Sequence, residues 1–180
     1  MKKILFVVGS LRGESFNRQM AVEAEKMLGG EADVRWLDYG AVPMLNQDNE
    51  FPTPEAVVRL REAVTESNAV WIFTPEYNGS YPGHLKNLLD WLSRPEKPMD
   101  YATPTSIVGK AVAISGAGGK AATAGCRAKL TEMLTFIRAN VLPEQTGVAL
   151  PPESWSTNRL ILSDADRQSL QAQADALIGQ

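Results

Sequence analysis

Five short apolar segments alternate with longer segments of helical periodicity along this chain of 180 residues, and few folds satisfy such an alternation. The apolar segments occupy residues 4–8, 34–37, 69–73, 111–114 and 147–150. Continuous apolar runs of this length are typical of strands buried on both faces of a parallel sheet. Helices are expected at about 17–28, 54–64, 82–92, 121–139 and 164–178. The pattern predicts an α/β protein with a doubly wound, five-stranded parallel sheet.

Length and composition favour one globular domain spanning residues 1–180, because 44% hydrophobic residues suffice for one sizeable core. A net charge of −3 gives no reason to expect nucleic acid or an anionic membrane surface as a partner. No apolar segment approaches the length of a membrane span. The single Cys126 excludes an intramolecular disulfide and fits a reducing cytoplasm, so we expect a cytoplasmic protein. A metal site built on this cysteine and the single His84 is not expected.

The first strand is followed by polar residues with the spacing S-x-R-x-x-S-x-N, namely Ser10, Arg12, Ser15 and Asn17. They precede a helix, whose free N–H groups and positive dipole end favour an anion. Neither a P-loop nor a G-x-G-x-x-G sequence occurs here, so the pattern favours a monophosphate over a triphosphate or a dinucleotide. The alternative is an ordinary helix cap with solvated polar neighbours.

The segment 73–91 reads F-T-P-E-Y-N-G-S-Y-P-G-H-L-K-N-L-L-D-W and joins the third strand to a helix. Pro75 restricts the backbone, and Asn78-Gly79 supplies residues that accept positive φ. Backbone groups here are suited to the edge of a flat heterocycle, and Tyr77 offers a stacking surface. Glu76 has no evident partner that would make it a general base, so a role in loop positioning or an inter-subunit ion pair is the better interpretation.

A third polar segment, residues 115–119, follows the fourth strand with the sequence S-G-A-G-G. Its glycines would permit close approach of a ligand, although such a turn is a weak signal by itself. In the common strand order 2-1-3-4-5, the first and third strands flank the topological switch point, where ligands of doubly wound sheets bind. Because the two richest loops follow these two strands, fold and site are predicted together.

Several other residues attract attention. His84 lies at the start of a helix and is expected to be structural. Cys126 within a helix is expected to be a buried small hydrophobe rather than a nucleophile. Trp71 and Trp91 fall on strand and helix faces and are expected in the core. Trp155, in a proline-rich segment, is interpreted either as a cover for an active site or as part of a subunit interface.

Residues 9–17 and 74–91 resemble the two signatures of the NADPH-dependent FMN reductase family, whose members have a flavodoxin-like fold and include quinone, azo and chromate reductases. The resemblance implies FMN and NADPH or NADH as cofactors, and a homodimer or homotetramer. It assigns the FMN phosphate to the first polar loop, the isoalloxazine ring to the second and a further FMN contact to the third. The implied FMN-binding residues are Ser10, Arg12, Ser15, Asn17, Pro75, Glu76, Tyr77, Asn78, Gly79 and Ser115.

The resemblance implies an oxidoreductase that passes hydride from a nicotinamide to FMN and then electrons to a small-molecule acceptor. Quinones, flavins, azo compounds and metal oxyanions are the acceptor classes considered. No catalytic side chain is expected, because the reaction takes place on the flavin itself. Two alternatives stay open. One is a flavodoxin-type electron carrier that does not oxidise NAD(P)H, and the other is an enzyme of sugar phosphates or nucleotides that uses the same cleft without flavin.

Overall fold

The computed structural model describes residues 1–179 and contains one five-stranded, all-parallel sheet in the order β2-β1-β3-β4-β5. The strands are β1 (Lys2–Val8), β2 (Ala32–Trp36), β3 (Ala69–Phe73), β4 (Ala111–Gly118) and β5 (Asn140–Ala149). The predicted fold class and strand order are confirmed. β3 is the middle strand and β1 lies next to it, so both are interior strands, which explains why both are continuous apolar runs.

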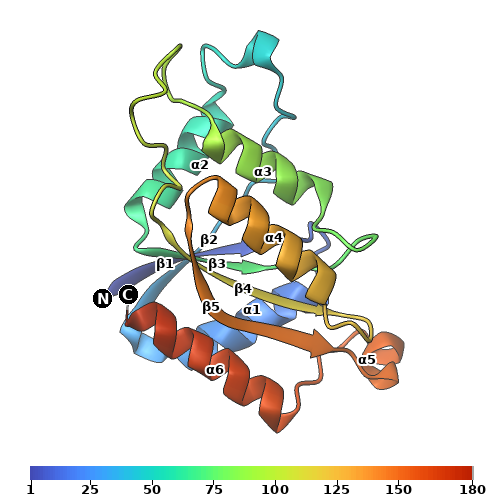
Figure 1. Cartoon of the computed structure of the whole chain (residues 1–180). Helices are drawn as coiled ribbons and strands as arrows, with labels where there is room; N and C mark the ends of the chain where they lie inside the picture. Colours follow the sequence, from blue (N-terminus) through green and yellow to red (C-terminus); the bar gives the residue numbers. More distant parts are fainter. Residues whose placement is uncertain (180) are drawn as a thin grey trace.

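Helices cover both faces of the sheet (Figure 1). They are α1 (Phe16–Leu28), α2 (Glu55–Glu66), α3 (Gly83–Ser93), α4 (Ala124–Phe136), α5 (Pro152–Thr157) and α6 (Asp164–Ile178), with short 3₁₀ turns at Gly29–Glu31 and Gln47–Asn49. α1 and α6 pack on one face, whereas α2, α3 and α4 pack on the other. Within residues 1–179, none of the helices combines the length and the apolar character needed to cross a bilayer.

The core consists of two apolar layers because successive side chains of a strand point to opposite faces. Ile4, Phe6 and Val8 of β1 belong to the layer under α1 and α6, while Leu5 and Val7 belong to the layer under α2, α3 and α4. The predicted core tryptophans are confirmed, since the side chains on β3 and α3 are 0% and 1% exposed.

The largest differences from the predicted strands concern β4 and β5: β4 extends further toward the carboxyl edge of the sheet, and β5 begins nearer the amino edge. β4 continues through residues 115–118, which pair with 146–149 of β5. Because these residues are Ser, Gly, Ala and Gly, the composition of the segment is that of a turn although it is a strand. β5 begins at Asn140. The polar residues before Gly147 have the composition of a loop, but they belong to this edge strand. The pairing of β5 with β4 has an irregularity between Val112 and Ile114.

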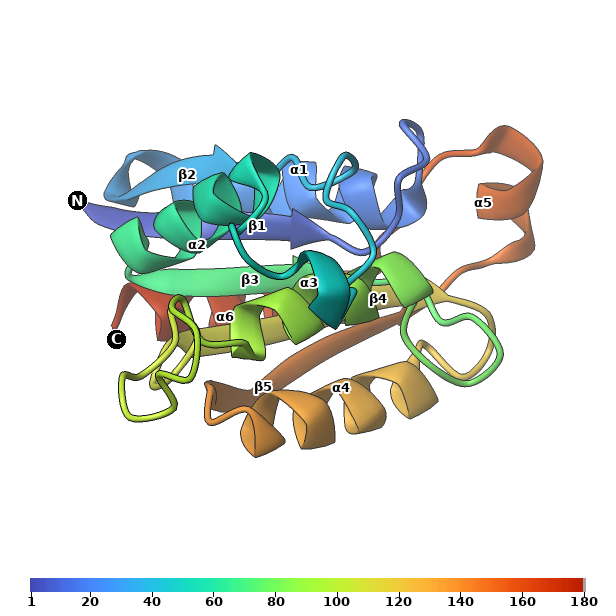
Figure 2. The same cartoon turned by 90° about the horizontal axis from the view of Figure 1, so that it is seen from above.

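The helices also differ from the prediction. α4 begins at Ala124 rather than near 121, because Ala122 and Thr123 have φ values of 47° and 58°, which lie outside the right-handed helical region, and it ends at Phe136 rather than near 139. The segment 151–157 was expected to be a proline-rich loop, but it contains the short helix α5. Seen from above, α5 lies beyond the carboxyl ends of the strands and covers neither face of the sheet (Figure 2).

Candidate functional site

Three segments start together at the carboxyl edge of the sheet: the first loop (residues 9–15), the central loop (74–82) and the glycine segment (115–119). Strand register brings them there, since Val8 pairs with Phe73 and Phe73 pairs with Ser115. Two hydrogen bonds continue this register into the loops, from Gly9 N to the Phe73 carbonyl (2.7 Å) and from Thr74 N to the Ser115 carbonyl (2.9 Å). The predicted juxtaposition of the three polar segments is therefore present.

The first and central loops are in direct contact at Gly9. A Cβ atom at this position would lie only 2.6 Å from the Thr74 hydroxyl oxygen, closer than side chains tolerate. Thr74 is itself fully buried. A glycine after the first strand therefore permits the close approach of two loops that belong to different parts of the sequence.

A cavity of about 370 Å³ opens where the three segments meet. Its lining residues are Ser10, Arg12, Ser15, Phe16, Asn17, Pro75, Glu76, Tyr77, Ala117, Gly118, Gly119, Trp155 and Asn158. Small-molecule sites commonly have volumes of roughly 300–1,000 Å³. A larger cavity of about 480 Å³ runs along α2 and is lined by Arg61, Glu62 and Glu96 among others. We place the candidate site in the smaller cavity, because ligands of doubly wound sheets bind at the carboxyl ends of the strands.

One end of the cavity has the groups that bind an anion. The hydroxyl of Ser15 caps α1 by accepting a hydrogen bond from Arg18 N (3.1 Å). The first-turn amides of Phe16 and Asn17 have no acceptor within the helix and lie at its positive end. The hydroxyl of Ser10 accepts from Arg12 N (3.4 Å), and the Arg12 side chain lines the same end. Hydroxyls, helix amides and one guanidinium form a donor set that fits a phosphate group.

Asn17 lines this end but has its side-chain amide engaged elsewhere. The side chain is 2% exposed, its Nδ2 donates to the Ala117 carbonyl (3.1 Å), and its Oδ1 accepts from Ala117 N (2.9 Å). These paired hydrogen bonds link the start of α1 to the glycine segment. The side chain of Asn17 therefore fixes the shape of the cavity, and its backbone N–H is the group left for an anion.

The central loop forms a tight two-residue turn. Tyr77 N donates to the Ser80 carbonyl (2.8 Å), and Ser80 N donates to the Tyr77 carbonyl (3.1 Å). Between them, Asn78 and Gly79 have φ values of 52° and 69°, the two positive angles of a type I′ turn. The expected positive φ is thus present. Neither turn residue lines the cavity, whereas Tyr77 lies on its rim with 51% of its surface exposed.

Glu76 connects the central loop to α4. Its Oε2 accepts a hydrogen bond from Cys126 N (2.8 Å), in the first turn of that helix. A carboxylate at this position satisfies a free helix amide and interacts favourably with the helix dipole. The contact supports the loop-positioning interpretation of Glu76 and gives no support to a general base.

Ser115 does not line the cavity. Its side chain is fully buried, its hydroxyl accepts from Trp71 Nε1 (2.9 Å), and it donates to Gln173 Oε1 (2.7 Å) of α6. Residue 115 is still part of β4 and its side chain points into the core, so the expected FMN contact of Ser115 stays a prediction. The lining residues of this segment are instead Ala117, Gly118 and Gly119.

Comparison with known proteins decides the family. Residues 2–150 match the sequence profile of a family described as NADPH-dependent FMN reductase. The chain belongs to the NADPH-dependent FMN reductase family. This membership confirms the sequence-based predictions of an oxidoreductase and of FMN with a nicotinamide nucleotide as cofactors.

The share of this chain that aligns with individual members of the FMN reductase family differs from one member to another. The chain is 32% identical to an NAD(P)H-dependent FMN reductase of Pseudomonas aeruginosa, with 97% of this chain and 92% of that protein aligned. It is 37% identical to a 2-hydroxy-1,4-benzoquinone reductase of a Burkholderia species, and that match spans only 63% of each protein. The solved structure of FerB, a flavoenzyme NAD(P)H:(acceptor) oxidoreductase from Paracoccus denitrificans, has a TM-score of 0.85 at 31% identity and covers 99% of this chain and 96% of FerB.

His84 and Cys126 lie outside the cavity of this FMN reductase family member. His84 stacks on Tyr39 with a centroid distance of 5.7 Å, and its Nε2 is buried without a hydrogen-bond partner among the described residues. The sulfur of Cys126 is buried 3.8 Å from the Thr74 hydroxyl oxygen, and burial raises the pKa of the thiol to about 11. Both residues therefore have the structural environments that were expected.

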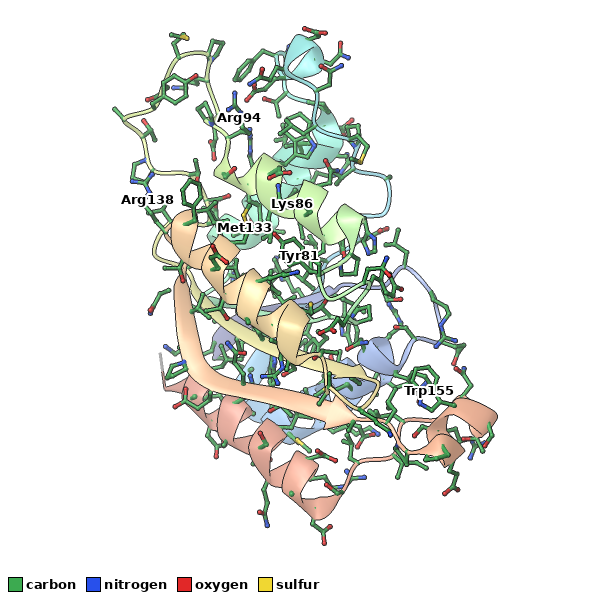
Figure 3. The ribbon with its side chains drawn as sticks, turned by 45° about the vertical axis from the view of Figure 1, so that its right-hand side comes forward. Tyr81, Lys86, Arg94, Met133, Arg138 and Trp155 are labelled. Carbon is green, nitrogen blue, oxygen red and sulfur yellow. The ribbon has the colours of Figure 1, made fainter. Side chains whose placement is uncertain are left out.

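α5 brings to the cavity residues that the sequence analysis missed or left undecided. Trp155 lies on the rim, 57% exposed, and meets the Phe16 ring edge-on at 5.2 Å (Figure 3). Asn158 ends α5 with a φ of 54°, a left-handed conformation that asparagine tolerates. A Trp shortly before an Asn in a proline-rich segment was the available signal, but it does not reveal which loop the segment contacts.

Proposed function

We propose that the protein oxidises NAD(P)H through FMN bound in the cavity at the carboxyl edge of the sheet, and that it passes the electrons to a small quinone-type acceptor. The observation that carries this proposal is the cavity itself. It has an anion-binding end at the start of α1 and an exposed aromatic residue, Tyr77, on its rim. The names of the two relatives and of FerB, a reductase of FMN, a benzoquinone reductase and an acceptor oxidoreductase, agree with it.

The proposed roles follow the three segments. Ser10, Arg12, Ser15 and the backbone of Asn17 would hold the phosphate, as the donor set at the start of α1 suggests. Pro75, Glu76 and Tyr77 would face the ring, while Asn78 and Gly79 shape the turn that presents them. Ala117, Gly118 and Gly119 would form the opposite wall. When bound, FMN supplies the hydride and electron chemistry, and the chain supplies position and electrostatics.

No acid–base pair is part of the proposal. Among the described residues that line the cavity, Glu76 is the only carboxylate, and its Oε2 already accepts the Cys126 N–H. In this proposal, one side of the cavity stays open so that the nicotinamide and then the quinone-type acceptor, both planar, can bind there one after the other. Tyr77 and Trp155, each more than half exposed, offer aromatic surfaces for such stacking.

The first experiment is an anaerobic absorbance titration of the protein reconstituted with FMN. Addition of NADPH is expected to bleach the bound flavin, and subsequent addition of 1,4-benzoquinone is expected to restore its absorbance. Bound flavin that stays oxidised with both NADPH and NADH would favour the electron carrier. A protein that binds no FMN would overturn the proposal. Parallel trials with an azo dye, free flavin and chromate as oxidants test whether the acceptor is a quinone.

We also propose that the protein is cytoplasmic and forms a homodimer or homotetramer. Phe136 on α4 is 83% exposed, and Tyr101 is 67% exposed, so large aromatic surfaces are available to a second copy. The buried, unpaired Cys126 is compatible with a reducing compartment. Light scattering on the FMN-loaded protein tests the assembly, and a monomeric mass at micromolar concentration would contradict it.

A further inference from the structure

The segment that contains α5, residues 151–160, lies outside the part of the chain that matches the family profile, which ends at residue 150. It nevertheless contributes two residues to the wall of the cavity, Trp155 and Asn158. We propose that this segment makes the site selective for phosphorylated flavin, because Asn158 positions the guanidinium of Arg12 at the phosphate end. This inference rests on the proposed function, since it assumes that FMN occupies the cavity.

The segment spans from one wall of the cavity to the other. At its start, Leu150 N donates to the Gly118 carbonyl (2.8 Å), which fixes it to the glycine segment. At its end, Leu160 N donates to Gln19 Oε1 (2.7 Å) on α1. The stretch between these anchors supplies Trp155 and Asn158 to the cavity, whose lining also includes Ser15 and Phe16 where the first loop enters α1. Its position therefore places its side chains next to the proposed phosphate.

Asn158 makes three contacts with the first loop and α1. Its Oδ1 accepts from Arg12 Nη1 (2.9 Å), its Nδ2 donates to the Glu14 carbonyl (3.4 Å), and its own carbonyl accepts from Gln19 Nε2 (3.0 Å). Only the first of these contacts orients a charged group of the cavity. Arg12 is otherwise an exposed side chain, and a free arginine side chain loses rotamer entropy when a ligand fixes it.

An aromatic pair supports Arg12 from a second side. Its guanidinium carbon lies 5.6 Å from the centroid of the Phe16 ring, within the range of a cation–π contact. The same ring packs edge-on against Trp155 at 5.2 Å and an interplanar angle of 78°. The segment thus holds Arg12 through Asn158 and supports the ring beneath it through Trp155. The guanidinium N–H groups that Asn158 does not engage stay available for a phosphate.

If Asn158 had only a structural role, its removal would change the binding of FMN and of riboflavin in a different way from the proposal. If the residue only ended α5, its removal would lower stability and weaken every flavin ligand equally. If it acts through Arg12 on the phosphate, its removal should weaken FMN but not riboflavin, which lacks the phosphate. If Asn158 acts through Arg12, removal of Asn158 should no longer weaken FMN binding in a protein that lacks Arg12, because the two residues contribute through one shared interaction.

The test is a double-mutant cycle with Asn158→Gly and Arg12→Ala, in which the Kd of the apoprotein for FMN and for riboflavin is measured by flavin fluorescence. Glycine is chosen because it retains the left-handed backbone at position 158 while removing the side chain. Asn158→Gly is expected to raise the Kd for FMN by about tenfold, as loss of a hydrogen bond to a charged group would. It is expected to leave the Kd for riboflavin unchanged and to have little effect in the Arg12→Ala background.

Ser156→Ala is the matched control, because this α5 side chain donates only to the Glu153 carbonyl and does not line the cavity. Its Kd for FMN should equal that of the unmodified protein. An Asn158→Gly protein with an unchanged Kd for FMN, or with equal increases for both flavins, would overturn the inference alone. An unmodified protein that binds neither flavin would overturn the proposed function as well.

Discussion

At the scale of single residues, Asn17 has a buried structural role, unlike the exposed Arg12 of the first loop. Its amide satisfies both backbone groups of Ala117 in the way that a further strand would. We predict that Asn17→Ala lowers the free energy of unfolding by about 2–4 kcal/mol, because two buried backbone groups lose their partners. Urea unfolding of the apoprotein measures this change, with the exposed Asn49→Ala as a control expected to stay within about 0.5 kcal/mol. Equal stabilities of the two variants would contradict the assigned role.

At the scale of elements, the central loop and α4 stabilise each other through Glu76. The carboxylate accepts the Cys126 N–H and lies at the positive end of the helix. We expect Glu76→Ala to lower the free energy of unfolding by about 1 kcal/mol, since helix caps typically contribute 0.5–2 kcal/mol. Glu76→Gln keeps a hydrogen-bond acceptor and should lose less than half of that amount. Thermal unfolding at low and high salt measures both, and a glutamine variant as unstable as the alanine variant would show that the hydrogen bond is unimportant.

At the scale of the whole molecule, His84 should govern the pH dependence of stability in mildly acidic solution. Burial lowers its pKa below the usual 6.5, although a hydrogen bond with the Gly9 backbone opposes the shift. The unfolded chain therefore binds the proton first, and the free energy of unfolding falls as the pH drops from about 6.5 to the folded-state pKa. The carboxyls of Glu23 and Glu50, whose pKa values are lowered chiefly by Lys26 and Arg94, should lose their contributions only below their ordinary pKa of 4.5. Urea unfolding at pH 7.5, 6.5 and 5.5 should show this decline in the unmodified protein and a flatter profile in His84→Gln. A decline of equal slope in both proteins would refute the assignment to His84.

Much of the architecture was predictable because it depends on local chemistry. The five strands follow from apolar runs, and α6 follows from helical periodicity. In its first turn, Ser163 is the N-cap, and the Ser163 hydroxyl accepts a hydrogen bond from Asp166 N (3.1 Å). The strand order then places the first and central loops at one edge, so Ser10, Arg12 and Tyr77 could be assigned to one cavity before any contact was known.

The sequence by itself therefore determined the class of fold, the edge of the sheet that holds the site and the chemistry of its two main loops. The tertiary structure decided which side chains reach the cavity. Ser115 turns into the core because β4 continues past its apolar run, and Asn17 meets Ala117 across 100 positions of sequence. Arg12 meets Asn158 across 146 positions. Helical periodicity and helix capping depend on residues that are close together in the sequence. The contacts of Ser115, Asn17 and Arg12 form only after the sheet has brought distant segments together.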